Sequence, residues 1–114
     1  EPLDDAGQER LKSAVRDDRI TFFVLKRRYR CIGMCSVAAA FSSFRCENFG
    51  IFEDFYIEPV FRGHGGARLL TDAAHSFGRE RRYTDITVTC APCDEDMYNS
   101  LGFATRLGSV YANI

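Results

Sequence analysis

The chain has 114 residues, a hydrophobic content of 46% and a formal net charge of −1. This length allows one domain with a modest core and is too short for two, and the hydrophobic content argues against a disordered chain. The near-zero charge gives no general attraction to nucleic acid or to an anionic membrane, and no apolar run reaches the length of a transmembrane helix. We therefore expect a single domain over residues 1–114, with neither nucleic acid nor a membrane as a partner.

The first half of the chain predicts one helix and an antiparallel hairpin. Part of an apolar stripe marks a helix over residues 3–18, and β-branched and aromatic residues predict strands over residues 20–26 and 31–41. The turn between the strands is basic, with Arg27, Arg28 and Arg30. We interpret these arginines as a solvated hairpin tip that resists edge aggregation, and a contact to an acidic ligand group is the alternative.

The middle of the chain predicts a strand and then a helix. A polar connection over residues 42–50 precedes a strand over residues 51–58. Strict alternation would place Phe52, Asp54 and Tyr56 on one face of that strand and Glu53, Phe55 and Ile57 on the other. The helix over residues 65–82 is expected to bury one apolar face, with His75 in solvent; the face consists of Leu69, Leu70, Ala73, Ala74 and Phe77.

The last part of the chain predicts a strand, a short helix and a final extended strand. These cover residues 85–90, 94–101 and 103–114, with Asp94 as N-cap and Gly102 at the C′ position of the short helix. The complete order predicts a mixed α/β fold of the α+β type, with a mostly antiparallel sheet and a βαβ unit at its centre.

The five cysteines cannot all pair within the chain. Cys31 and Cys35 fall in a strand pattern and are interpreted as small core residues. Cys90 and Cys93 form a C-x-x-C, for which we weigh a zinc site and a thioredoxin-like redox motif. We favour two free thiols in a reducing cytoplasm, and we expect no metal site.

The most informative stretch covers residues 55–70, in which an apolar strand runs through a glycine-rich turn into a helix. Such an arrangement directs unpaired backbone N–H groups and the positive end of the helix dipole at one point, which favours a phosphate or pyrophosphate. The Walker pattern is incomplete here, because no Gly-Lys-Ser/Thr follows the strand. The dinucleotide pattern G-x-G-x-x-G is also incomplete, because Arg68 stands where the third glycine would be. A strand-to-helix turn with no ligand is the structural alternative.

The pattern that fits is Arg/Gln-x-x-Gly-x-Gly/Ala, fulfilled by Arg62, Gly65 and Ala67. Here the chain resembles the GNAT superfamily of N-acetyltransferases. The resemblance implies a twisted sheet with helices on both faces and acetyl-coenzyme A as the acetyl donor. It also implies a donor site that uses the backbone of the strand and the loop, namely Phe55, Tyr56, Ile57, Arg62, Gly63, His64, Gly65, Gly66 and Ala67. A backbone N–H near Tyr56 or Ile57 would polarise the thioester oxygen.

Two side chains are implied as catalytic by the same resemblance. Residues 97–103 are similar to the family's second signature, in which a tyrosine faces the coenzyme A sulfur, so Tyr98 is the expected general acid. Residues 52–57 resemble the spermidine/spermine and thialysine acetyltransferase subgroup, in which the glutamate of a Glu-Asp pair is the proposed base. That role carries over to Glu53, while Asp54 is expected to be structural. Packing is the alternative for Tyr98, and a structural ion pair is the alternative for Glu53.

The resemblance covers nearly all of the chain, but the family's first strand and first helix have no counterpart in it. Ala91 and Asp94 also depart from the pattern that often precedes the family's tyrosine, which usually has an asparagine and a small residue there. An open sheet edge could be completed by a partner subunit or by residues outside this sequence, and we expect a homodimer.

We expect a cytoplasmic N-acetyltransferase that acts on a primary amine of a small or polyamine-like molecule. The alternatives are a non-catalytic acyl-coenzyme A-binding module and a protein or peptide N-acetyltransferase.

Overall fold

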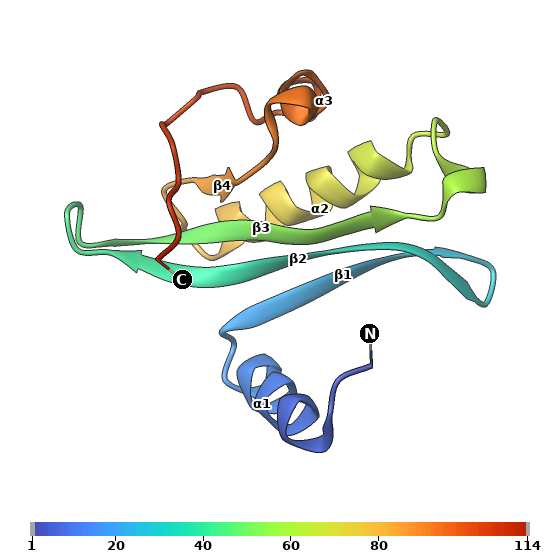
Figure 1. The fold of residues 1–114 in the computed structure, drawn as a ribbon, viewed down its shortest axis with the longest axis horizontal. Coiled ribbons are helices and arrows are strands. Elements are labelled where there is room, and N and C mark those ends of the chain that lie inside the picture. The colour runs from blue at the N-terminus through green and yellow to red at the C-terminus, as the bar shows by residue number, and fades with distance from the viewer. Residues whose placement is uncertain (1, 114) are drawn as a thin grey trace.

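The structure is a computed structural model that describes residues 2–113. Its centre is a four-stranded sheet in the order β1-β2-β3-β4 (Figure 1). The first three strands pair antiparallel and the last pairs parallel with β3; their bounds are β1 (Ile20–Arg27), β2 (Arg30–Ser42), β3 (Glu47–Ile57) and β4 (Ile86–Val88). This confirms the predicted mixed, mostly antiparallel α/β fold.

Helices lie on both sides of the sheet. Helix α1 (Asp5–Arg16) is on one side, and α2 (Gly66–Glu80) and α3 (Glu95–Ser100) are on the other (Figure 1). Short 3-10 turns, η1 (Pro59–Phe61) and η2 (Pro92–Asp94), precede α2 and α3 respectively. No described helix has the length and apolarity needed to span a membrane.

Helix α1 begins where Asp4 caps it, since the carboxylate accepts the Gly7 N–H at 2.7 Å. The helix buries none of its residues, and Leu3, Leu11 and Val15 remain exposed. The apolar stripe that marks this helix therefore lies at the surface in the described chain.

Strand β3 is longer than predicted and carries a bulge. It begins at Glu47, because Glu47 to Gly50 continue the ladder with β2, so the expected polar connection shrinks to a turn over residues 43–46. The register steps from Met34–Tyr56 to Ser36–Glu53, so that β3 contains one residue more than β2 at this point.

The bulge has its left-handed residue at Asp54, with φ at 57°. Alternation therefore breaks, and the predicted face assignment is wrong from Asp54 onward. Phe52 and Ile57 both belong to the buried core, and the rings of Phe52 and Phe55 lie 5.4 Å apart. The inserted residue therefore places Phe52, Phe55 and Ile57 on one face of β3. Strict alternation would place Phe52 on the face opposite to Phe55 and Ile57.

Helix α2 covers the sheet with a face of small residues. Its buried positions are Gly66, Leu70, Thr71, Ala74 and Gly78, whereas Leu69 and Ala73, predicted to be buried, are exposed. A Cβ on Gly78 would lie 2.8 Å from the Ile86 side chain. Glycine at this contact lets the helix approach the sheet closely, which turns the bulkier Leu69 outward.

The segment after α2 differs in two ways from the prediction. Asp94 precedes α3 but makes no side-chain cap bond and has helical backbone angles, because η2 runs directly into α3. Residues 103–113 form no strand, and Ile114 lies outside the described residues. An extended segment becomes a strand only where a neighbour supplies hydrogen bonds, and local sequence does not encode that neighbour. Gly102 is confirmed at the C′ position, with φ at 104°.

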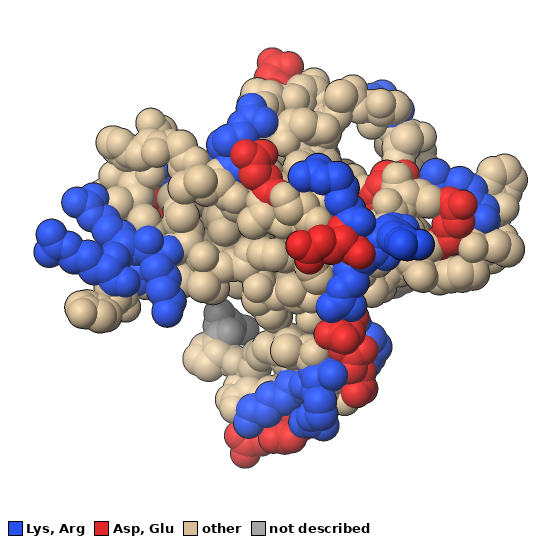
Figure 2. Space-filling view, turned by 180° about the vertical axis from the view of Figure 1, so that it is seen from behind, with Lys and Arg blue, Asp and Glu red and all other residues tan. Residues whose placement is uncertain are grey.

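Basic side chains gather at the end of the molecule where the β1–β2 hairpin turns (Figure 2). The guanidinium groups of Arg27 and Arg30 lie over the Phe61 ring at 5.6 and 5.9 Å, and Arg30 pairs with Glu58. Two of the three predicted tip arginines are therefore held against η1 instead of extending freely into solvent.

Candidate active site

The glycine-rich loop connects the end of β3 to the start of α2. Gly63 and Gly65 have φ angles of 79° and 87°, and a Cβ on either would meet no atom within 4 Å. The Leu69 N–H bonds to the Gly65 carbonyl at 3.2 Å. The N–H groups that precede it in α2 have no intrahelical partner, as at every helix start. The loop therefore offers an open backbone surface at a positive helix end.

The side chains of the loop motif divide into supporting and exposed ones. Arg62 braces the loop, because its Nε donates to the Ile57 carbonyl at 2.7 Å and its guanidinium lies 5.5 Å from the Tyr56 ring centre. His64 is exposed. Gly66 and Ala67 face inward: a Cβ on Gly66 would lie 2.5 Å from Leu25, and Ala67 packs against the core. Of the loop residues predicted to bind the donor, Arg62 and His64 therefore carry exposed side chains, whereas Ala67 packs inward.

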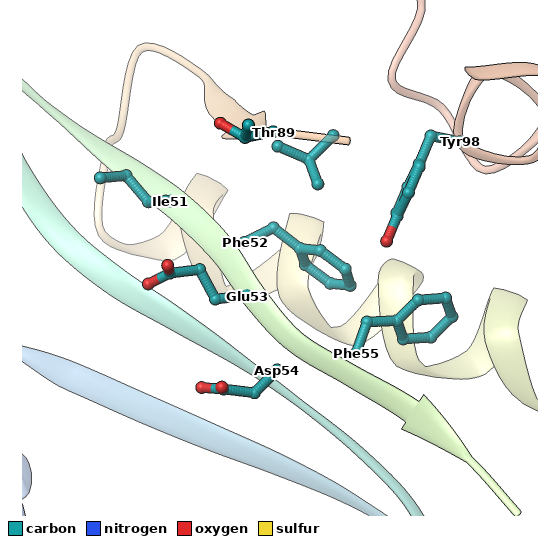
Figure 3. A pocket seen from close by; sticks show the side chains of 8 residues that line it. Ile51, Phe52, Glu53, Asp54, Phe55, Thr89 and Tyr98 are labelled. Carbon is teal, nitrogen blue, oxygen red and sulfur yellow. The ribbon is translucent and has the colours of Figure 1, made fainter. Parts of the chain in front are cut away.

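A cavity opens where β3 and β4 separate. The two strands pair only from Gly50–Ile86 to Phe52–Val88, and β3 continues to Ile57 paired with β2 on its other side but without β4. The cavity has a volume of about 250 Å³ and is lined by β3, the end of β4 and α3 (Figure 3). Backbone groups of β3 beyond Phe52 lack a β4 partner, which leaves them available to an extended ligand arm.

Tyr98 projects from α3 into this cavity. Its hydroxyl points toward Phe52 and Phe55 on β3 (Figure 3). The ring lies 6.5 Å from Phe52, 6.1 Å from Phe55 and 5.8 Å from Phe103. Burial, with smaller contributions from Asp94 and Cys90, raises the pKa of the Tyr98 phenol. The phenol therefore keeps its proton to a higher pH than an exposed tyrosine does.

Glu53 and Asp54 lie together, contrary to the prediction that they would occupy opposite faces. Both carboxylates point to the side of β3 away from Tyr98 (Figure 3). The physical reason is the bulge at Asp54, which interrupts the alternation. Asp54 accepts the Ser36 hydroxyl at 2.7 Å, whereas Glu53 has no side-chain hydrogen bond or ion pair among the described residues. Asp54 is therefore tied to β2, and Glu53 is the free carboxylate.

Sequence reasoning missed three residues of the site. Phe103 completes the aromatic wall around Tyr98, and its place directly after Gly102 in the signature was the available signal. Ser36 is fully buried and orients Asp54, but nothing in its own strand pattern indicates that partner. His75 was expected in solvent, yet its ring packs 5.2 Å from Phe103 and its Nε2 is buried.

The C-x-x-C lies near the site without forming a metal centre. Cys90 is half-buried at the end of β4, and Cys93 is exposed in η2. In residues 2–113 no three His, Cys, Asp or Glu side chains are grouped closely enough to hold a metal ion.

Comparison with protein-family models identifies the family. The model of the acetyltransferase (GNAT) domain matches residues 3–113. The chain belongs to the GNAT acetyltransferase family. This confirms the resemblance at the level of the family and, with it, the expected class of enzyme, an N-acetyltransferase. Comparison with curated protein sequences gave no match.

Solved structures share the fold at low identity. An aminoglycoside acetyltransferase from an uncultured soil metagenomic sample, in complex with sisomicin, has a TM-score of 0.86 at 14% identity, over 100% of this chain and 76% of that one. Glucosamine-6-phosphate N-acetyltransferase from Arabidopsis thaliana has a TM-score of 0.83 at 15% identity, over 98% and 80%. A predicted acetyltransferase from Clostridium acetobutylicum, with acetyl-CoA, has a TM-score of 0.79 at 18% identity, over 99% and 78%.

Proposed function

We propose that this GNAT protein uses acetyl-coenzyme A to acetylate a primary amine of a small, polyamine-like molecule. The observation that carries the proposal is the cavity at the separation of β3 and β4, with the Tyr98 hydroxyl on one side of β3 and the free Glu53 carboxylate on the other. The open loop between Arg62 and Ala67 lies at the end of the same strand.

The donor is bound along a continuous backbone surface. The first N–H groups of α2 and the glycine loop bind the pyrophosphate, because an anion is favoured at a helix N-terminus. The pantetheine arm pairs with the unpartnered part of β3, at Phe55, Tyr56 and Ile57. An N–H of this segment stabilises the negative charge that develops on the thioester oxygen.

Proton transfer is divided between the two sides of β3. An alkyl amine with a pKa near 10.4 is almost fully protonated at neutral pH, so Glu53 removes a proton, directly or through water, before the nitrogen attacks. Attack forms the carbon–nitrogen bond and breaks the carbon–sulfur bond. Tyr98 gives its proton to the departing sulfur, the nitrogen loses its second proton to water, and the phenolate takes a proton back from water, so that a neutral amide, a thiol and a neutral tyrosine result.

Charge on the acceptor side supports a cationic amine. Glu53 and Asp54 point to that side together, and the Ser36 hydroxyl is the hydrogen-bond donor to Asp54. Two of the solved neighbours bear names that refer to small amine substrates, an aminoglycoside and glucosamine-6-phosphate. These points support a small acceptor of the kind used by the spermidine and thialysine subgroup over a protein or peptide acceptor.

The remaining assignments are part of the same proposal. Residues 1–114 form one acetyltransferase-like domain without the family's first strand and helix, and it acts in the cytoplasm. Strand β1 lies at the edge of the sheet. A second copy that pairs or packs at this edge would make the protein a homodimer.

The test is an acceptor screen with acetyl-coenzyme A, with products detected by mass spectrometry. Detection of free thiol is unsuitable, because the protein itself carries five free cysteines. The panel contains spermidine, thialysine, an aminoglycoside, glucosamine-6-phosphate and a lysine peptide. Calorimetry with acetyl-coenzyme A and with desulfo-coenzyme A accompanies it. Acetylation of a small amine supports the proposal, donor binding without any product favours the non-catalytic module, and absence of donor binding by folded protein refutes the loop assignment.

A further inference from the structure

Helix α3, which carries Tyr98, is weakly anchored by itself. It has six residues and buries none of them, and it is preceded by a 3-10 turn and followed by irregular chain. A helix of this length is not stable without tertiary contacts. The position of the Tyr98 hydroxyl therefore depends on the contacts of its own ring with Phe52 and Phe55 and on the groups that hold the end of α3.

Two side chains of α2 hold that end. The Arg68 guanidinium donates to the carbonyl of Ser100, the last residue of α3. The last carbonyls of a helix lack intrahelical partners, and a cation there is favourable. Two turns further along α2, His75 lies beneath the turn that follows α3. Its Nε2 is 3.3 Å from the position that a Cβ on Gly102 would take, and its ring is 5.2 Å from that of Phe103.

The supported turn is bonded directly to Tyr98. The Tyr98 carbonyl accepts the N–H of Leu101 at 3.0 Å and the N–H of Phe103 at 3.1 Å. The Phe103 ring packs edge-on against the Tyr98 ring, with 5.8 Å between centroids. A displacement of Ser100 or Phe103 is therefore passed to the tyrosine through two hydrogen bonds and one aromatic contact.

We propose that Arg68 is a positioning residue for the general acid, which it holds by fixing the end of α3 to the first turn of α2. Arg68 follows directly after Ala67, the last residue of the donor loop. One helix start thus offers N–H groups to the donor phosphates and also fixes the helix that carries the proton donor. The proposal rests on the proposed function, since it takes Tyr98 as the acid.

Kinetics of matched arginine variants test the proposal. Arg68→Met keeps the length and apolar stem of the side chain but removes its donors. Arg79→Met is the control, because Arg79 is exposed on the same helix and its side chain bonds only to Ser76, 3.1 Å away in α2. We expect Arg68→Met to lower kcat about tenfold with a change in the donor KM of less than about twofold, and Arg79→Met to leave both constants unchanged. Arg68→Lys should recover part of the loss, since an ammonium can still donate to the Ser100 carbonyl.

A double-mutant cycle with Tyr98→Phe separates positioning from direct donor binding. If Arg68 acts through Tyr98, Arg68→Met should cause little further loss of kcat once the hydroxyl is gone. If the Arg68 guanidinium instead contacts the donor phosphates, Arg68→Met would weaken donor binding equally with and without the Tyr98 hydroxyl. This result would overturn the proposal.

A measurement without turnover keeps the proposal distinct from the proposed function. In protein labelled with 3-fluorotyrosine, the fluorine resonance of Tyr98 is identified by its loss in Tyr98→Phe. Arg68→Met should shift or broaden this resonance, and Arg79→Met should not. An unmoved Tyr98 resonance in folded Arg68→Met refutes the positioning role, whether or not any amine is acetylated.

Discussion

Two adjacent glycines at the start of α2 should respond differently to the same added methyl group. Gly65 has φ at 87° and faces open space, so Gly65→Ala meets no neighbouring atom but places an alanine in the left-handed region. Gly66 lies in the first turn of the helix, where alanine is favoured, but its Cβ would lie 2.5 Å from the Leu25 side chain and 3.5 Å from that of Ile57.

The magnitudes follow from these contacts. A non-glycine residue in the left-handed region costs about 1–2 kcal/mol, so Gly65→Ala should lower stability by roughly that amount. In Gly66→Ala, overpacking of about 1–3 kcal/mol is partly offset by a gain in helix propensity of about 0.5–1 kcal/mol. The net loss therefore lies between about 0 and 2.5 kcal/mol. The Leu25 contact is the end of a flexible side chain, so we expect a value in the lower half of this range, about 1 kcal/mol, or a decrease of about 4 °C in Tm.

Donor binding distinguishes the two variants. The methyl group of Gly65→Ala lies on the open face of the loop, so acetyl-coenzyme A affinity should fall at least about tenfold, a change of about 1.4 kcal/mol. The methyl group of Gly66→Ala points at the sheet, so most of its effect should be on Tm. Thermal unfolding followed by circular dichroism and calorimetric titration measure the two quantities. If Gly65→Ala binds the donor as tightly as the wild type, the loop is a structural turn and the argument fails.

Four further predictions concern single side chains of the site and core. Tyr98→Phe should lower kcat while calorimetry shows donor affinity nearly unchanged, and it should remove any fall of kcat at alkaline pH that reflects ionisation of the phenol; a large loss of affinity would instead identify a packing residue. Glu53→Gln should move the pH–rate profile to alkaline values, whereas Asp54→Asn, which still accepts the Ser36 hydroxyl, should move it little; identical profiles for wild type and Glu53→Gln would exclude Glu53 as the base. Ser36→Ala leaves Asp54 without its donor and should cost about 1 kcal/mol in urea unfolding, and no change in the midpoint would show that the bulge does not depend on this bond. Burial raises the pKa of the Cys35 thiol from 9.0 to about 12, so above pH 9 the unfolded chain loses this proton while the folded chain keeps it, and stability falls with rising pH; this fall should be smaller in Cys35→Ala, and an equal fall in both proteins would contradict the assignment.

Much of the fold was predictable because its signals are local. The hairpin, the helix after the glycine loop and the turn at Gly102 all depend on residues within a few positions of one another. The motifs also indicated which elements carry the glycine-rich loop, the tyrosine and the two carboxylates, but not the side of β3 to which the carboxylates point. What each of these residues does in catalysis stays a prediction.

Errors arose where a residue's environment depends on distant parts of the chain. The bulge at Asp54 depends on the register of β3 against β2, and it decides that Glu53 and Asp54 share a side. Leu69 and Ala73 were assigned to the wrong face, because the apolar pattern of the helix does not show that Gly66 and Gly78 lie against the sheet. His75 was misassigned because the turn that covers it lies more than 25 positions later in the sequence.

The amino-acid sequence by itself determined the order of elements up to the last helix, the open glycine-rich loop and the resemblance to the family, because glycine positions, hydrophobic periodicity and short motifs act through local backbone geometry. Only the tertiary structure decided which side chains meet: the pairing of Ser36 with Asp54, the aromatic wall around Tyr98 and the support of α3 by Arg68. Strand register and helix packing bring these groups together, and both depend on contacts between segments that are far apart in the chain.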